Sequence, residues 1–408
     1  MKLNNKEMTK IRETEKQKRI EEILTRGVEE VISKALLAGK LKSRSKLRIK
    51  FGIDPTGSKI HIGRAVPLWK LKAFQELGHQ IVLIIGDFTG QIGDASDKQA
   101  MRKRLSEQEA KENLKNYAKQ IGRILDMDKV EIRYNSEWFK KMNIKDLLNL
   151  AMNFTVQQMI HRRNFKERWD KGSPIGLHEI DYPLLQGFDS KAVKADVEIG
   201  GFDQLFNLKI GREIQKIFNQ KPQDIMTLKM LPGLDGRKMS TSWGNVINIA
   251  DKPKEQFGKI MSIKDELILS YLELCTKTPL TEIKEIEEKL KAKKVNPREI
   301  KLKLSREIVS LYHGKKPAFE AEQEFERVFK RKKLPSQILE ARIKEKSLNL
   351  LDLLKKTKIA SSKAEAKRLI LQSGIKIDKE IQKDWRRRIK IKKGMIIQAG
   401  KRRFSRLI

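Results

Sequence analysis

The chain has 408 residues, 39% of them hydrophobic, and a single cysteine, Cys275. This length predicts two or three domains, the hydrophobic content excludes a wholly disordered chain, and one cysteine excludes a disulfide framework and a cysteine metal cluster. The formal net charge of +36 predicts a polyanionic partner such as nucleic acid, although a lysine-rich composition throughout the chain is an alternative explanation.

Residues 1–45 are charged and have a helical pattern, so they are predicted to form an N-terminal helical segment. Beyond them, short apolar runs bounded by turn residues alternate with helical stretches, of which the clearest covers residues 63–77. Strands that alternate with helices predict an α/β fold, with a Rossmann-like parallel-sheet domain over residues 46–248. The predicted strands are residues 47–53, 81–85, 130–134 and 195–199.

The alternating pattern ends near residue 248, and an α-helical domain is predicted over residues 249–335, followed by a linker at 336–348. Residues 349–408 predict a small α+β domain of two helices followed by short strands. From Leu351 onward there are 19 Lys and Arg residues against 5 Asp and Glu residues. This local excess of positive charge predicts an RNA-binding module, and the alternative is a basic solvated tail.

The first candidate site is residues 51–64, where a predicted strand leads through a tight turn into a helix. The unpaired N–H groups and the positive dipole end at a helix N-terminus favour phosphate. His61 and Arg64 are three residues apart and lie on one helix face, and Gly63 lets a nucleotide approach the backbone closely. Donors here would stabilise charge on an ATP α-phosphate; the alternative is a surface histidine beside a helix start.

The second candidate site is the loop of residues 234–243, which is basic and contains glycine and serine. Small residues allow the loop to close, and Lys238 would follow pyrophosphate as it leaves. Taken alone, the loop is typical of an exposed basic turn. Two such segments, about 175 residues apart and flanking one α/β domain, together predict an ATP site.

These two segments resemble the HIGH and KMSKS signatures of class I aminoacyl-tRNA synthetases. Residues 182–189 resemble the Y-x-x-x-Q-x-x-D helix of tyrosyl-tRNA synthetases, residues 197–204 their G-G-x-D-Q turn, and residues 86–94 their T-G-x-I-G-D loop. Residues 349–408 resemble the S4-type RNA-binding domain that ends bacterial members, and residues 134–138 resemble the longer bacterial branch. The resemblance covers essentially the whole chain after residue 45.

The resemblance implies that tyrosine is activated with ATP as a substrate and transferred to tRNA(Tyr). Mg²⁺ would accompany the ATP, with no metal bound in a protein cage. The implied catalytic residues are His61, Arg64, Lys238 and Thr56. The implied ATP-binding residues are Asp54, Gly63, Asp203, Lys98, Arg102, Met239 and Ser240. The implied tyrosine-binding residues are Thr89, Asp94, Tyr182 and Gln186 at the ammonium, Asp189 at the phenol hydroxyl, and Asn135 and Gln204.

Three positions depart from the family pattern. Arg64 stands where the first signature usually has a second histidine, and arginine keeps a donor while adding a fixed charge. Thr241 stands where the second signature has its second lysine, a loss for which Arg237 is a candidate replacement. Lys50 stands where many relatives have a tyrosine that reaches the substrate phenol, so specificity is expected to depend more heavily on Asp189.

The resemblance further implies a homodimer formed through the catalytic domain, using the segment around residues 149–160. The acid-containing N-terminus, the solitary cysteine and the lack of a long apolar run predict a cytoplasmic protein without a membrane span. Three alternatives stay open: tryptophan specificity on the same fold, an RNA-binding descendant of a synthetase that no longer catalyses, and a nucleotidyltransferase with a similar ATP site. Asp189 and the C-terminal module argue against the first, and Arg64 and Thr241 support the second.

Overall fold

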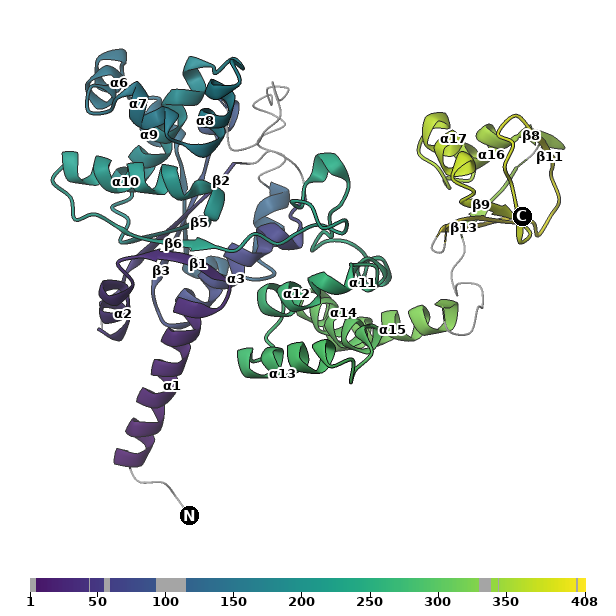
Figure 1. Ribbon diagram of the computed structural model, residues 1–408, viewed down its shortest axis with the longest axis horizontal. Helices are drawn as coiled ribbons and strands as arrows, with labels where there is room; N and C mark the ends of the chain where they lie inside the picture. Colours follow the sequence, from purple (N-terminus) through teal and green to yellow (C-terminus); the bar gives the residue numbers. More distant parts are fainter. Residues whose placement is uncertain are drawn as a thin grey trace. The chain divides into compact units, whose positions relative to one another are not determined.

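The computed structural model describes residues 5–43, 45–54, 59–92, 115–329, 339–343, 345–400 and 403–408 (Figure 1). The chain divides into two compact units, Met1–Ala318 and Phe319–Ile408, and each is considered by itself. Among the described residues, no helix is long and apolar enough to cross a membrane.

The first unit is built on a six-stranded sheet with the order β1-β6-β5-β2-β3-β4. Strands β2 to β6 are mutually parallel, and β1 pairs antiparallel with β6 at one edge. This arrangement confirms the predicted α/β class with a mostly parallel sheet. The strands are β1 (Val28–Ile32), β2 (Arg48–Ile53), β3 (Gln80–Ile85), β4 (Val130–Tyr134), β5 (Val197–Gly201) and β6 (Asp224–Leu228).

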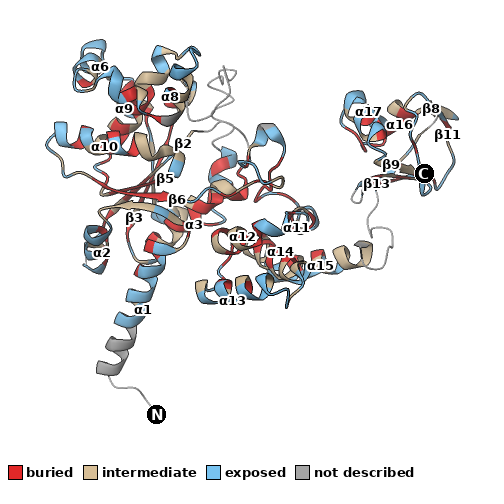
Figure 2. Cartoon of the chain, viewed as in Figure 1, coloured by how far each residue is buried: buried red, intermediate tan, exposed pale blue. Residues whose placement is uncertain are grey.

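The inner strands form the core of this unit, as Figure 2 shows by their burial. Every residue of β6 and the last five residues of β3 are buried. Helix α3 (Ile62–Glu76) packs against β3 and β5, and helix α10 (Leu205–Ile217) packs against β5 and β6. Helices that cover a parallel sheet explain why its strands are apolar runs, because side chains on both faces are removed from water.

The strand order reverses between β2 and β5. From β2 the chain adds β3 and then β4 on one side, and β5 and β6 then lie on the other side of β2. In open parallel sheets, ligands bind outside the carboxyl ends of the strands at such a reversal. The topology therefore predicts a binding site beside the segments that follow β2 and β5. These segments carry Asp54 and Asp203.

Two strands of this six-stranded sheet, β1 and β6, were not predicted from the sequence. β1 lies inside the segment that was expected to be helical, between α1 (Asn5–Thr25) and α2 (Lys34–Lys42). It reads Val-Glu-Glu-Val-Ile, and as a half-exposed edge strand it keeps charged residues that suit a helix equally well. Gly27 and Ser33, both with left-handed backbones, separate it from the two helices. β6 is short and begins with an aspartate, so its apolar run was too brief to be recognised.

The remaining helices of the sheet region flank the strands, and a helical region follows the sheet. In that later region α11 packs against α14, which begins with Asn296 as its cap and Pro297 at its first turn and buries Leu304 and Ile308. The helices are α5 (Ser136–Phe139), α6 (Ile144–Ala151), α7 (Val156–Ile160), α8 (Arg163–Asp170), α9 (Leu177–Ala192), α11 (Pro253–Met261), α12 (Ile268–Cys275), α13 (Leu280–Lys291), α14 (Pro297–His313) and α15 (Lys315–Phe329).

The second unit is a small α+β body with its own core. Its five-stranded sheet has the order β10-β9-β12-β13-β7, and β11 pairs with β8. Leu353, Ile370 and Ile397 are fully buried between the helices and the sheet. β7 and the first two residues of β8 fall in the range 336–348 that was predicted as a linker, where charged residues between short apolar runs concealed them. The elements are β7 (Leu339–Ala341), β8 (Ser347–Asn349), α16 (Leu350–Lys356), α17 (Lys363–Leu371), β9 (Ile375–Ile377), β10 (Glu380–Ile381), β11 (Arg388–Lys390), β12 (Ile396–Ala399) and β13 (Arg403–Leu407).

Candidate active site at the carboxyl ends of the strands

The first candidate segment begins helix α3. His61 is the cap residue of α3, and its Nδ1 accepts a hydrogen bond of 3.2 Å from the backbone N–H of Arg64. On either side of it, Ile62 donates to the carbonyl of Ile247 at 2.8 Å, and Ile249 donates to the carbonyl of Ile60 at 2.9 Å. The helix start is thus held by backbone pairing to a segment that lies just beyond the second signature loop.

The lowered pKa of His61 sets its protonation state, and the cap hydrogen bond sets its tautomer. Burial, followed by the positive charges of Arg64 and Lys238, lowers the pKa of His61 to about 3. The ring is therefore neutral at pH 7, and because Nδ1 accepts, its one proton lies on Nε2. A buried neutral imidazole with a fixed N–H donor suits an oxygen that gains charge during a reaction.

The second candidate segment is organised by Asn245. Its side-chain Nδ2 donates to Asp235 at 2.8 Å and to the carbonyl of Lys238 at 3.1 Å, while its Oδ1 accepts from the backbone N–H of Ser240 at 2.8 Å. Asp235 also forms an ion pair of 2.6 Å with Arg237. One side chain thereby gives the loop a defined shape on both sides of Lys238.

The two segments meet, as the sequence predicted. A Cβ atom on Gly63 would lie 3.2 Å from Nδ1 of His61 and 3.5 Å from the sulfur of Met239, so glycine allows this close approach. Lys238 extends to Asp203, just after β5, with 3.1 Å between Nζ and Oδ2. Arg64 donates to the Tyr117 hydroxyl at 2.6 Å. Arg64 and Lys238 both lie close enough to His61 for their charges to lower its pKa, and of these groups Lys238 reaches the segment that follows β5.

A second cluster forms around Asp54 at the carboxyl end of β2. The Tyr182 hydroxyl donates to Oδ2 at 2.8 Å, and the Thr89 hydroxyl donates to Oδ1 at 3.1 Å. Asn135, directly after β4, donates to the Thr89 oxygen at 2.8 Å. Gly86 is required beside them, because a Cβ atom there would lie 1.9 Å from Oδ1 of Asp54. A carboxylate between two hydroxyl groups suits a small cation such as a substrate ammonium.

The third cluster lies along helix α9. Tyr182, Gln186 and Asp189 occur at positions that share one helix face. Asp189 is 5% exposed, and its Oδ1 accepts a hydrogen bond of 2.9 Å from Nε1 of Trp138. Burial raises the pKa of Asp189 to about 7, while the charge of Lys50 and the Trp138 bond oppose the rise. Asp189 is thus a buried hydrogen-bond acceptor whose pKa lies close to pH 7.

Two further polar residues in the site were not predicted. Asn207 is fully buried and donates to Oε1 of Gln186 at 2.7 Å and to Oε1 of Gln204 at 3.1 Å, so it orients both amides. Trp138 stands in the motif that marked the family branch but received no role. Asn207 follows Gln204 by one helical turn, and that spacing was the available signal.

Fourteen of the eighteen predicted site residues are described. The structure brings His61, Gly63, Lys238, Met239 and Asp203 together, and Asp54 together with Tyr182, Thr89 and Asn135. Arg64 joins the first group through His61, and Ser240 joins it through Asn245. Asp189 joins the second group through a hydrogen bond with Asn135. Gln186 and Gln204 are linked to each other through Asn207. Thr56, Asp94, Lys98 and Arg102 lie outside the described residues. Within the described ranges, no three His, Cys, Asp or Glu side chains are grouped so that they could hold a metal ion.

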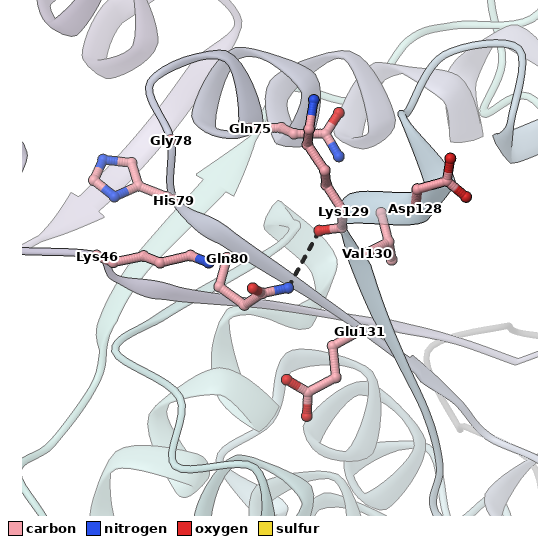
Figure 3. A pocket seen from close by; sticks show the side chains of 9 residues that line it. All are labelled: Lys46, Gln75, Gly78, His79, Gln80, Asp128, Lys129, Val130 and Glu131. Atoms are coloured by element: carbon pink, nitrogen blue, oxygen red, sulfur yellow. Dashed lines mark hydrogen bonds between the residues drawn. The ribbon is translucent and has the colours of Figure 1, made fainter.

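A separate hollow of about 430 Å³ lies at the amino ends of strands β3 and β4 (Figure 3). Gln80, the first residue of β3, bridges it by donating to the carbonyl of Lys129, immediately before β4, at 3.2 Å. Gln75, His79 and Glu131 also line it. Because it adjoins the amino ends of β3 and β4, it is remote from the strand ends at which the clusters converge.

Comparisons with known proteins agree on one family. A family model described as class I tRNA synthetases (W and Y) matches residues 41–330. The tyrosine–tRNA ligase of Moorella thermoacetica is 44% identical over 390 residues, 94% of this chain and 94% of that protein. The tyrosine–tRNA ligase of Thermotoga maritima is 44% identical over 386 residues, 94% of this chain and 96% of that protein.

Solved structures share the fold at lower identity. A truncated mitochondrial tyrosyl-tRNA synthetase of Aspergillus nidulans has a TM-score of 0.63 and 20% identity, covering 78% of this chain and 100% of that one. A tyrosyl-tRNA synthetase of Archaeoglobus fulgidus, solved with L-tyrosine, has a TM-score of 0.60 and 23% identity, covering 76% of this chain and 99% of that one. At these identities the likeness concerns the fold alone.

Proposed function

Because the chain belongs to the class I tRNA synthetases of the tryptophan and tyrosine type, we propose that it is a tyrosine–tRNA ligase. In the first step a carboxylate oxygen of tyrosine attacks the α-phosphate of ATP, forming tyrosyl-adenylate as pyrophosphate leaves. In the second step the terminal adenosine of tRNA(Tyr) takes the tyrosyl group and AMP leaves. The observation that carries the choice of tyrosine is Asp189, a buried acceptor at the far end of the α9 face.

The chain contributes positioning and electrostatic stabilisation to the first step, without a protein nucleophile. The neutral Nε2–H of His61 would donate to the α-phosphate as charge develops there. Lys238, which now pairs with Asp203, would exchange that partner for the leaving pyrophosphate, and Gly63 and Met239 would form the wall for the adenosine. Mg²⁺ accompanying the ATP would neutralise the remaining phosphate charge.

The cluster around Asp54 would receive the ammonium of tyrosine. This extends the role expected for Asp54, because Tyr182 and Thr89, both expected at the ammonium, donate to its two oxygens. Gln204, held by Asn207, would present its amide N–H to the substrate carboxylate. We assign Asp94 to the same ammonium site, Thr56 to the ATP side, and Lys98 and Arg102 to the pyrophosphate, on the family pattern alone.

The C-terminal unit would bind the tRNA. We propose residues 349–408 as an S4-like RNA-binding domain, residues 46–248 as the catalytic domain and residues 249–335 as the domain that contacts the anticodon, with 336–348 between the last two. In the C-terminal unit the ring of Trp385 lies 4.4 Å from Nζ of Lys367 and 4.8 Å from the guanidinium of Arg386. Cations gathered on an aromatic ring suit an RNA surface.

A homodimer is part of the proposal, in the cytoplasm where tRNA is charged. Four apolar side chains on α6 and the start of α7 are exposed: Ile144 by 80%, Leu148 by 58%, Met152 by 82% and Val156 by 55%. Ile144 and Leu148 lie on one face of α6, Met152 is the C-cap of α6, and Val156 is the first residue of α7. Large apolar side chains grouped in this way favour a protein interface, and sedimentation of the full chain would test it.

ATP–pyrophosphate exchange measured in parallel with tyrosine, tryptophan and phenylalanine tests the proposed activity. Exchange with tyrosine alone, followed by charging of tRNA(Tyr), is the expected result. Exchange with tryptophan alone would assign the second specificity of the family. Exchange with none of the three would make the chain a non-catalytic relative that retains RNA binding.

A further inference from the structure

Lys50 is a fully buried cation in the middle of β2, directly beneath helix α9. Its Nζ contacts Oε1 of Glu198 at 2.7 Å, the Ser190 hydroxyl at 2.7 Å and the backbone carbonyl of Gln186 at 3.0 Å. Glu198 is its direct neighbour in the parallel pairing of β2 with β5. The ammonium group thus has three acceptors, two of which belong to the turn of α9 that contains Asp189.

The carboxylate partner is equally well satisfied. Oε2 of Glu198 accepts from the Ser190 hydroxyl at 3.0 Å and from the side-chain amide of Gln223. Gly211 of α10 makes room for this group, because a Cβ atom there would lie 2.8 Å from the Gln223 amide nitrogen and 2.9 Å from the Ser190 oxygen. One ion pair is therefore enclosed by residues from several elements. They come from β2, β5, α9 and α10, and from Gln223 just before β6.

Stability alone does not account for such a pair. Removing two charges from water costs several kcal/mol per ion, and apolar replacements of similar volume are often at least as stable. The pair is instead informative through its position. It ties the backbone of Gln186 and the side chain of Ser190 to the centre of the sheet, and Asp189 lies between these two residues in α9.

We propose that the Lys50–Glu198 pair positions Asp189 and thereby controls discrimination between tyrosine and phenylalanine. The pair acts as a positioning element, since Lys50 makes its contacts below α9 whereas Asp189 is the group that would meet the substrate hydroxyl. This inference rests on the proposed activity and deepens it, because it names the residues that make the acceptor effective.

The charges of the pair act on Asp189 in opposite directions. Lys50 of β2 lowers the pKa of Asp189 and Glu198 of β5 raises it, with Lys50 the stronger influence; hydrogen bonds from Trp138 and Asn135 also lower it. Among the described residues these are the groups found to act on it, besides burial. A charged carboxylate accepts a strong hydrogen bond from the phenol hydroxyl, whereas a protonated carboxyl accepts a weaker one.

The test removes the pair as a unit, so that no unpaired charge is left in the core. The variant is Lys50→Met with Glu198→Gln. The matched control is Lys40→Met with Asp224→Asn, which removes a Lys–carboxylate pair of 2.6 Å at the start of β6, with side chains 19% and 3% exposed. For both proteins, kcat and KM for tyrosine and phenylalanine are measured by ATP–pyrophosphate exchange between pH 6 and 9, and folding is followed by thermal unfolding.

The core variant is expected to raise the KM for tyrosine about tenfold at pH 7 with kcat within about threefold, and to leave phenylalanine unchanged, as expected when one hydrogen bond to a charged group is weakened. The KM for tyrosine is expected to fall as Asp189 loses its proton, and in the core variant this fall is expected at a higher pH than in the wild-type protein. The control should keep the wild-type ratio of tyrosine to phenylalanine. An unchanged ratio in a folded core variant would overturn the inference.

A second variant keeps the inference testable if the first does not fold. Ser190→Ala keeps both charges paired and removes one of the two contacts between Lys50 and α9, so the KM for tyrosine should rise in the same direction as in the double variant, by a smaller factor, with phenylalanine unchanged. An unchanged KM for tyrosine, or equal changes for both amino acids, would contradict the inference. If the wild-type protein shows no tyrosine-dependent exchange, the proposed activity is refuted. If the wild-type protein is active but the variants do not change the tyrosine KM, only the role of the ion pair is refuted.

Discussion

The two ends of the candidate site use the same kind of ion pair under opposite conditions. At the ATP end, the side chains of Lys238 and Asp203 are 41% and 26% exposed. At the opposite end, those of Lys50 and Glu198 are 0% and 2% exposed. A hydrated pair is worth little and exchanges partners readily, whereas a buried pair must be fully satisfied and holds its surroundings in place. The ATP end is therefore suited to following a leaving group, and the other end to rejecting a wrong side chain.

Replacing His61 should break the ATP end alone and give the largest effect. In His61→Ala, the rate of adenylate formation should fall by about 10² to 10³, the magnitude typical of a lost donor to a developing charge, with the KM for tyrosine changed less than about threefold. Single-turnover measurements with saturating tyrosine check this. An intact single-turnover rate would show that the site was wrongly assigned.

Replacing Asp189 should break the other end alone. Asp189→Asn keeps the size of the side chain and an oxygen for Trp138, but removes the charged acceptor. The kcat/KM for tyrosine should fall by about 10- to 100-fold, as expected for a hydrogen bond to a charged group, and that for phenylalanine should stay constant. Equal losses with both amino acids would indicate a structural role for Asp189 and would remove the contrast between the two ends.

The free energy of unfolding should depend on pH through His61 at the ATP end. The folded-state pKa of His61 is about 3 against a reference value of 6.5, so below pH 6.5 the unfolded chain binds a proton that the folded chain does not. Stability contributed by the neutral ring is thus present above pH 6.5 and is lost as the pH falls. Between pH 7 and 4.5, wild-type protein should lose on the order of 2 kcal/mol more unfolding free energy than His61→Asn. Urea unfolding at both pH values checks this, and parallel losses would contradict it.

Loosening the second signature loop should give the smallest effect. Asn245→Ala removes three hydrogen bonds within the loop without touching Lys238 Nζ. The kcat of exchange should fall by about three- to tenfold, since lost order in an exposed loop corresponds to roughly 1 kcal/mol. Asn245→Asp retains the acceptor for the Ser240 N–H but sets a second carboxylate against Asp235 and the Lys238 carbonyl, so its kcat should fall at least as far. A change in tyrosine discrimination in either variant would show that the ends are coupled.

Sequence patterns predicted the parts of the site that depend on local order. His61, Gly63 and Lys238 stand in short segments whose residue types follow from helix capping and loop closure, and Tyr182, Gln186 and Asp189 follow from helical spacing. Strands β2, β3, β4 and β5 were recognisable as short apolar or alternating runs. These features are encoded within a few residues, so they can be identified without knowledge of the fold.

The features that escaped prediction depend on partners distant in the sequence. Lys50 stood out only as a departure from a family pattern, because its partner Glu198 is 148 positions away and its burial follows from strand pairing. β1 was concealed because a charged edge strand resembles a helix until β6 is placed beside it. Asn207 received no role, because the amides that it orients come together only when α9 and α10 pack.

The most direct test of the central claim is the ratio of kcat/KM for tyrosine to that for phenylalanine in wild-type ATP–pyrophosphate exchange. A site built to bind a hydroxyl rejects the analogue without it by about 10⁵ in tyrosyl-tRNA synthetase itself; that magnitude belongs to the family and is not calculated from this structure. We predict a ratio above about 10³ for this chain. A ratio near one, or exchange that does not depend on tyrosine, would contradict the assignment of Asp189 and with it the account of the site.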